Sequence, residues 1–386
     1  MINIAKTRIL VVCPDFVYPP NHGGRVDIWN RIKALNKLGG CVDIVCTVKN
    51  QPLDEYVAVV QKYANKLFLT ERKNTIEDMF FYYPLQFHSR RNLKNIKINN
   101  YYDLVLLEDT SVFGILENDT LRYDKLLLRL QNNNNIYYRN LSRSESVLWK
   151  KLYFFIESLK FKKLDKAVME KVGNVAYISI DEMLYCNKNN NIKKVFFLPA
   201  AIDLNIKKQS LSSHTVLLLG NLFMPNNQEG IKFYMEKIHP KLLDVDNYKL
   251  IIAGNSRGIS LKWLDLLCSR YNNIKIYDSP KTLESIYAAS SVFVNPLLHG
   301  AGVKLRTINA IENGMPVVST KVGNEGTGLI NGEHIMISDD SENIVKCIKL
   351  LLKDEQIRRK LAINAQNYLI EHYNHEMALK QVLASL

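Results

Sequence analysis

The chain has 386 residues, of which 47% are hydrophobic, and a formal net charge of +13 at pH 7. This length favours two globular domains, and no apolar run approaches the ~20 residues that a membrane-spanning helix requires. Residues 1–203 hold 30 Lys and Arg against 21 Asp and Glu. That surplus favours an anionic membrane surface or a phosphorylated acceptor over nucleic acid, because the sequence carries no zinc finger, RNP motif or KH loop.

The first half alternates short apolar runs with amphipathic segments. Strands are predicted at residues 7–13, 41–48 and 65–70, and helices at residues 25–39 and 52–64. Strands and helices that alternate from the start of a chain predict a doubly wound parallel sheet.

A loop with two adjacent glycines, Gly23 and Gly24, opens the first predicted helix. Free backbone N–H groups at a helix start form an anion site, so this loop is a candidate phosphate contact. His22 stands beside the glycines. We interpret it either as an acid/base group or as an ordinary loop residue.

Two acidic residues, Glu108 and Asp109, end the strand predicted at residues 102–110. Ligands of open α/β sheets bind at the carboxyl ends of the strands. The two acids are therefore candidates for orienting an acceptor hydroxyl or acting as a base. The alternative is a pair of solvated turn residues.

Two basic segments of the first half have two interpretations each. Residues 74–101 are irregular and hold four cations, which indicates a solvated loop or a border of the acceptor or membrane. Residues 142–171 form a helix or a helix pair with eight Lys and Arg against four Asp and Glu, interleaved with aromatic residues. A basic amphipathic helix of this kind lies on a membrane or packs with a wet lysine face.

The second half begins another alternation of strands and helices after a hinge near Pro199. Three predicted strands end at residues that would face a ligand at the sheet edge, namely Gly220–Asn221, Gly254 and Asp278. The one D-x-D pattern, Asp244–Asp246, precedes a strand, so it lies at the wrong end of the sheet for a donor metal.

The stretch 291–328 is predicted to be a strand, a glycine loop, a helix and a second strand. Gly300 and Gly302 lie in the loop, and Lys304 and Arg306 in the first helical turn. A helix dipole disfavours cations at its N-terminus, so these two indicate an anionic ligand such as phosphate. The alternative is a tight turn with two solvated cations.

This stretch resembles the nucleotide-binding signature of family 4 glycosyltransferases of the GT-B type. Ten residues fall on the pattern: Gly300, Gly302, Leu305, Ala310, Gly314, Pro316, Val317, Val318, Ser319 and Thr320. The G-N-x-x-x-P-N pattern from Gly220 to Asn226 matches the same branch. Two family carboxylates are amides here: Asn309 replaces the glutamate that bonds the donor ribose, and Asn134 replaces the acid of an H-N-x-E motif.

The resemblance covers nearly the whole chain and implies a GT-B fold. That fold has two Rossmann-like, doubly wound parallel-sheet domains that face a cleft, and a C-terminal helix that crosses back to the first domain. The implied boundaries are an acceptor domain at residues 1–203, a donor domain at 204–370 and the returning helix at 371–386.

The resemblance also implies the reaction and its site. A hexosyltransferase-type enzyme would move a sugar from a UDP- or GDP-sugar to a glycan or lipid-linked hydroxyl, with retention and without a metal ion or cofactor. The catalytic candidates are Glu108, Asp109 and His22. The donor-binding candidates are Gly23, Gly24, Asn221, Gly254, Asp278, Gly300, Gly302, Val303, Lys304, Leu305, Arg306 and Asn309.

Two other interpretations stay open beside this one. The amides at Asn309 and Asn134 are compatible with a non-catalytic GT-B subunit that binds a partner transferase or the acceptor. A Rossmann oxidoreductase is disfavoured because no G-x-G-x-x-G follows the first strand. Six cysteines without a C-x-x-C pair predict a reducing, cytoplasmic setting. The basic first half predicts peripheral contact with the anionic inner face of the plasma membrane.

Overall fold

The computed structural model describes residues 7–20, 23–145, 147–189, 194–202, 204–210, 212–300 and 302–386. The chain divides into two compact units. Unit 1 comprises Met1–Asp203 together with Tyr373–Leu386, and unit 2 comprises Leu204–His372. Among the described residues, no helix combines the length and the apolar composition that crossing a membrane requires.

Unit 1 is built on a parallel sheet, which has seven strands within the described residues, in the order β3-β2-β1-β4-β5-β6-β7. The order runs outward from β1 in both directions, so the predicted doubly wound topology is confirmed. The strands are β1 (Arg8–Cys13), β2 (Cys41–Val48), β3 (Lys66–Glu71), β4 (Tyr101–Leu107), β5 (Arg122–Leu130), β6 (Asn174–Tyr177) and β7 (Lys194–Phe197).

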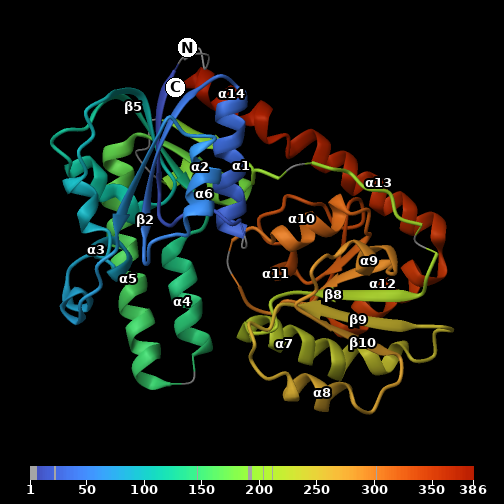
Figure 1. The fold of residues 1–386 in the computed structure, drawn as a ribbon. Helices are drawn as coiled ribbons and strands as arrows, with labels where there is room; N and C mark the ends of the chain where they lie inside the picture. The colour runs from blue at the N-terminus through green and yellow to red at the C-terminus, as the bar shows by residue number, and fades with distance from the viewer. Residues whose placement is uncertain are drawn as a thin grey trace. The chain divides into compact units, whose positions relative to one another are not determined.

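Helices connect these strands, as parallel pairing requires. Most of the basic segment 142–171, predicted as one helix or two, forms α5 (Leu148–Val172), and its first residues end α4 (Asn134–Ser144). The two helices form a hairpin that extends away from the sheet (Figure 1). The α-helices are α1 (Gly23–Lys37), α2 (Asp54–Gln61), α3 (Leu85–His88), α4 (Asn134–Ser144), α5 (Leu148–Val172) and α6 (Ile180–Asn189). Short 3-10 segments lie at Ile76–Phe80, Arg91–Asn95 and Thr110–Glu117.

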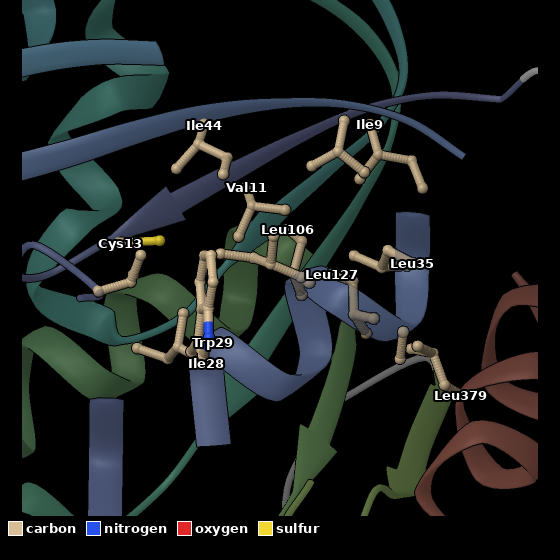
Figure 2. Close-up of a cluster of buried hydrophobic side chains, with 14 of the residues drawn as sticks. Ile9, Val11, Cys13, Ile28, Trp29, Leu35, Ile44, Leu106, Leu127 and Leu379 are labelled. Carbon is tan, nitrogen blue, oxygen red and sulfur yellow. The ribbon is translucent and has the colours of Figure 1, made fainter. Parts of the chain in front are cut away.

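The C-terminal helix α14 (His375–Ser385) completes the core of unit 1. Its Leu379, Val382 and Leu383 are buried in one cluster with Ile9 of β1 and Trp29 of α1. Figure 2 shows Leu379 beside side chains of the strands and of α1. The predicted return of the last helix to the first domain is therefore confirmed.

The first residue of α14, His375, makes unit 1 sensitive to acid. The ring is buried, and its Nδ1 donates to the carbonyl oxygen of Pro199 at 3.2 Å. Burial, with help from the nearby Arg31 charge, lowers the pKa of His375 from 6.5 to about 3. The folded state therefore binds fewer protons than the unfolded state, and stability is lost as the pH falls from 6.5 towards 3.

Replacing His375 with glutamine should flatten this dependence. The wild-type free energy of unfolding should fall between pH 7.5 and pH 5, and the fall should be smaller in His375→Gln because its side chain does not titrate. Urea unfolding at the two pH values measures both. His299→Gln is the matched control because that ring is exposed. An equal fall in all three proteins would contradict the assignment.

Unit 2 carries a second parallel sheet, which has six strands among the described residues, in the order β10-β9-β8-β11-β12-β13. The strands are β8 (Thr215–Leu219), β9 (Lys249–Gly254), β10 (Ile274–Asp278), β11 (Val292–Asn295), β12 (Val317–Ser319) and β13 (Met336–Ile337). The helices are α7 (Pro225–Phe233), α8 (Lys262–Cys268), α9 (Glu284–Ala288), α10 (Leu305–Glu312), α11 (Lys321–Asn324), α12 (Ser341–Lys353) and α13 (Glu355–His372).

Candidate functional site

The switch point of unit 2 lies between β8 and β11, which are neighbours in the sheet although other strands separate them in the chain. Connections leave these two strands towards opposite edges of the sheet, and ligands of open α/β sheets bind at that point. Gly220 and Asn221 follow β8, and the loop 296–304 follows β11. The sequence-predicted donor residues of the second half therefore gather at one edge of this sheet.

Two glycines allow the ends of β8 and β9 to approach closely. A methyl group on Gly254 would lie 1.6 Å from the carbonyl oxygen of Gly220. A methyl group on Gly220 would lie 2.6 Å from Nη1 of Arg306. Side chains at these positions would push apart the two strand ends and displace the guanidinium, so both glycines shape the switch point.

Replacing Gly254 with alanine should destabilise unit 2 by about 1–3 kcal/mol, the usual cost of inserting a methyl group into a packed interior. Thermal unfolding measures the loss of stability, and hydrogen exchange of unit 2 peptides assigns the loss to unit 2. Gly114→Ala in unit 1 is the control, because its methyl group would meet Phe87 at 3.7 Å, an ordinary contact. Equal melting temperatures for Gly254→Ala and wild type would refute the close approach.

Arg306, in the first turn of α10, reaches across this switch point. Its Nη1 donates to the carbonyl oxygen of Leu219 at the end of β8, at 3.3 Å. Burial lowers the pKa of Arg306 to about 10, and no charged group among the described residues offsets that effect. A partly buried cation without an acidic partner is costly, so this position suits an anionic ligand.

Lys304 is placed differently, although the sequence predicts the same role for it. The side chain is buried, and its Nζ donates to the Glu325 carboxylate at 2.8 Å and to the Gly302 carbonyl oxygen at 2.6 Å. Gly302 has a φ of +76°, in the left-handed region that favours glycine. The geometry therefore gives Lys304 a role in holding the loop, and leaves Arg306 as the cation at the switch point.

The rest of α10 presents one face to the core and one to solvent. Ile308 and Ile311 are buried, as their helical spacing predicts, whereas Val303 and Leu305 are half-buried. Asn309 is exposed, one helical turn after Arg306. Residues three apart in a helix share a face, so Asn309 lies on the same side of α10 as Arg306.

Asp278, at the end of β10, organises the loop after β9. Its carboxylate accepts hydrogen bonds from the Ser279 hydroxyl at 2.8 Å and from the hydroxyl and backbone N–H of Ser256 at 2.8 and 3.1 Å. These bonds lower the pKa of Asp278, with the largest effect from Ser279. Ser279 itself has a φ of +48°, an uncommon conformation for a residue with a side chain. A role in binding the nucleotide base stays a prediction.

In unit 1 the corresponding switch point lies between β1 and β4, and the two acids after β4 have different surroundings. Glu108 is fully buried, and both its oxygens accept hydrogen bonds from Arg31, at 2.8 and 3.1 Å. Asp27 also contacts Arg31, at 2.5 Å. A carboxylate that is buried and held on both oxygens favours a structural role over the predicted role of base.

Asp109 is the more accessible of the two acids. Its Oδ1 caps the 3-10 segment by accepting a hydrogen bond from the backbone N–H of Ser111 at 2.7 Å. Its Oδ2 accepts a hydrogen bond from Nδ2 of Asn134 at 3.1 Å. A glutamate at residue 134 would bring a second negative charge to Asp109, whereas the amide donates to it. Because Asp109 is partly exposed and Glu108 is buried, Asp109 remains the candidate for contact with an acceptor hydroxyl.

The glycine loop of unit 1 opens α1 at Gly23, as predicted. The preceding His22 lies outside the described residues, and its role stays a prediction. Arg25 in the first turn pairs with Asp15 at 2.6 Å, which ties the helix start to the loop after β1. Gly24 accepts a long hydrogen bond from Gln131, at 3.5 Å.

The irregular basic segment 74–101 borders a hollow of about 550 Å³ in unit 1. Two of its cations have structural partners: Arg90 is buried and donates to the Pro14 carbonyl oxygen at 2.7 Å, and Arg91 pairs with Asp78 at 2.8 Å. Aromatic and basic side chains line much of the hollow, including Phe81, Tyr83, Phe87, His88, Arg91 and Lys94.

Comparison with known proteins agrees with this geometry. Residues 213–354 match the family described as Glycosyl transferases group 1. The chain is 35% identical over 388 residues to an uncharacterised 44.6 kDa protein in the cps region of Klebsiella pneumoniae, which covers 97% of this chain and 98% of that protein. An uncharacterised glycosyltransferase of Methanocaldococcus jannaschii is 25% identical over 254 residues, 61% of this chain and 63% of its own length.

Solved structures share the fold at low sequence identity. TarM of S. aureus matches with a TM-score of 0.73 and 11% identity, over 100% of this chain and 99% of that chain. HepE of Anabaena, in complex with UDP and glucose, matches with a TM-score of 0.65 and 13% identity, over 98% of this chain and 100% of that chain. Residues 213–354 therefore match the group 1 glycosyltransferases, and the chain as a whole has the GT-B fold of the solved structures.

Proposed function

We propose that this protein is a glycosyltransferase that moves a sugar from a nucleotide diphosphate sugar to a hydroxyl acceptor, with retention at the anomeric carbon. The observation that carries the proposal is Arg306, a partly buried cation at a switch point with no charged group among the described residues to offset its burial. A donor diphosphate supplies the missing negative charge. The nucleotide of the HepE complex supports a UDP-sugar as the first donor to test.

In this mechanism the bond between the anomeric carbon and the diphosphate oxygen breaks, and the acceptor oxygen bonds to the same face of the sugar. Arg306 stabilises the negative charge that develops on the leaving diphosphate, which is the kind of interaction that usually contributes most to catalysis. Asn309 bonds a ribose hydroxyl. Asp109 orients the acceptor hydroxyl. The family 4 resemblance implies that a donor phosphate oxygen takes the proton of that hydroxyl.

The acceptor that we propose is a glycan or a lipid-linked glycan of a surface polysaccharide. The relative from the cps region of Klebsiella pneumoniae supports this class, since it matches nearly the whole chain. Assembly of such a glycan on a lipid carrier would take place at the cytoplasmic face of the plasma membrane, whose anionic lipids suit the net charge of +13.

Calorimetric titration of the full chain tests the donor class. UDP- and GDP-sugars are compared with nicotinamide dinucleotides, and we expect saturable binding of one nucleotide sugar only. Hydrolysis or transfer of that donor is then followed by release of the nucleoside diphosphate. Binding of a nicotinamide dinucleotide in place of every nucleotide sugar would overturn the proposal.

The second candidate function is a non-catalytic subunit that binds a partner transferase or the acceptor. The amides at Asn309 and Asn134 motivate it, because an amide cannot make the charge-assisted bond of a carboxylate. Nucleotide-sugar binding without turnover, even with acceptor glycans present, would favour this candidate. Turnover above background that Arg306→Ala abolishes would exclude it.

A further inference from the structure

Helix α5 has an apolar face that the described residues of unit 1 leave exposed. Leu148 and Leu152 are 81% and 60% exposed, and Phe155 and Leu159 continue the same row at spacings of three and four residues. Trp149 and Ile156 widen it. We name these six residues the apolar face of α5.

The opposite side of α5 already packs on unit 1. Phe161, Leu164, Val168 and Val172 are buried against the sheet, again at helical spacing. A helix that is apolar on two sides is normally covered on both. The apolar face of α5, which extends for roughly 17 Å along the axis, therefore requires a second apolar environment.

Cations follow the apolar face along the same side of the helix. Lys162, Lys163 and Lys166 come directly after Leu159 and turn towards the same side, and Lys162 and Lys166 are well exposed. We name these three residues the lysine band. At 1.5 Å per residue the band begins about 5 Å beyond the last apolar side chain.

A second segment of unit 1 lies level with the lysine band. Lys160 Nζ donates to the carbonyl oxygen of Met79 at 2.6 Å, and Lys163 Nζ lies 4.3 Å from the ring centre of Tyr82. These contacts hold the segment 79–82 beside α5. Its Phe80 is 84% exposed and Tyr82 is 64% exposed. Aromatic side chains are enriched at the level of lipid headgroups, where lysines also lie.

We propose that unit 1 docks on a bilayer containing anionic lipids through the apolar face of α5, the lysine band and the segment 79–82. On this side of the helix the order is apolar first and then cationic with aromatic neighbours, which matches the order of acyl chains and anionic headgroups in a leaflet. An anionic leaflet neutralises the lysine band, whereas a parallel pair of such hairpins would bring two lysine bands together. The inference deepens the proposed function, since it locates the surface that would meet a lipid-linked acceptor.

Vesicle flotation of the full chain tests this without donor or acceptor, so its outcome is independent of the proposed reaction. Vesicles of phosphatidylcholine alone are compared with vesicles that also contain phosphatidylglycerol. The wild type should float with the anionic vesicles. Leu148→Ser combined with Leu152→Ser should lower the partition coefficient at least about tenfold, because each buried leucine contributes ~1.5–3 kcal/mol.

Lys162→Gln combined with Lys166→Gln should lower binding to anionic vesicles by about tenfold or more, since each lysine near such a surface contributes ~1 kcal/mol. It should leave binding to neutral vesicles unchanged. Matched controls in unit 2 are Leu266→Ser, at a leucine of similar exposure, and Lys346→Gln combined with Lys353→Gln on α12. Neither should change flotation.

Three outcomes would overturn the proposal. The first is a wild type that stays with the unbound fraction at low salt. The second is equal flotation of the leucine variant and the wild type. The third is a wild-type dimer in light scattering that the leucine variant converts to a monomer, which would assign the apolar face to a second copy.

Discussion

Replacing Arg306 with alanine should lower kcat/KM for the preferred donor by about 100- to 1000-fold. That is the usual cost of removing one preorganised donor that stabilises developing charge. Arg306 is the expected source of this charge because its pKa is lowered by burial alone, with no acidic partner among the described residues. Nucleotide affinity should fall as well, since the diphosphate itself would lose a cation. Steady-state kinetics and calorimetric titration with the nucleoside diphosphate measure the two effects.

Two further variants give this test its specificity. Arg306→Lys should recover only part of the loss, because an ammonium is a point charge and cannot bond two phosphate oxygens in the planar way of a guanidinium. Arg270→Ala should have no effect, since Arg270 is exposed and precedes β10, at the amino end of that strand. Unchanged nucleotide affinity in a folded Arg306→Ala protein would remove Arg306 from the donor site.

The comparison of Lys304 with Arg306 shows how far sequence reasoning reached at this site. Helical position predicts that both cations lie at the start of α10, and they do. Which cation is available depends on Glu325, 21 residues further along the chain, whose carboxylate takes the lysine. Spacing within one motif carries no information about a partner in another loop.

The same limit explains Glu108. Its position at the carboxyl end of β4 was predictable from the apolar run before it. Its burial was not, because that depends on Arg31, 77 residues earlier in the chain. By contrast, the strands and the parallel sheets depend on hydrophobic periods that the sequence displays directly, and the return of α14 follows from the resemblance to GT-B proteins. Local pattern therefore predicted the framework, whereas long-range ion pairs decided which polar residues remain available.

Replacing Arg31 with alanine should destabilise unit 1 by about 3–5 kcal/mol, because it leaves buried carboxylates without their partner. Burial alone would raise the pKa of Asp27, but the charges of Arg31 and Arg129 outweigh it and set that pKa at about 2. Without Arg31 the pKa of Asp27 should rise. Hydrogen exchange of unit 1 peptides in a urea series measures the loss of stability.

The dependence on pH separates this charge effect from a simple cavity. Protonation of Asp27 removes a buried charge that has lost its main partner, so the deficit of Arg31→Ala should shrink as the pH falls from 7.5 to 5, whereas a cavity would cost the same at both pH values. Adding Glu108→Gln should recover part of the stability at pH 7.5 for the same reason.

Lys37→Ala, which breaks the exposed pair with Glu376, should cost less than about 1 kcal/mol. Because Glu108 immediately precedes Asp109, a deficit that follows this pattern would also mean that a buried ion pair holds the candidate acceptor residue in place.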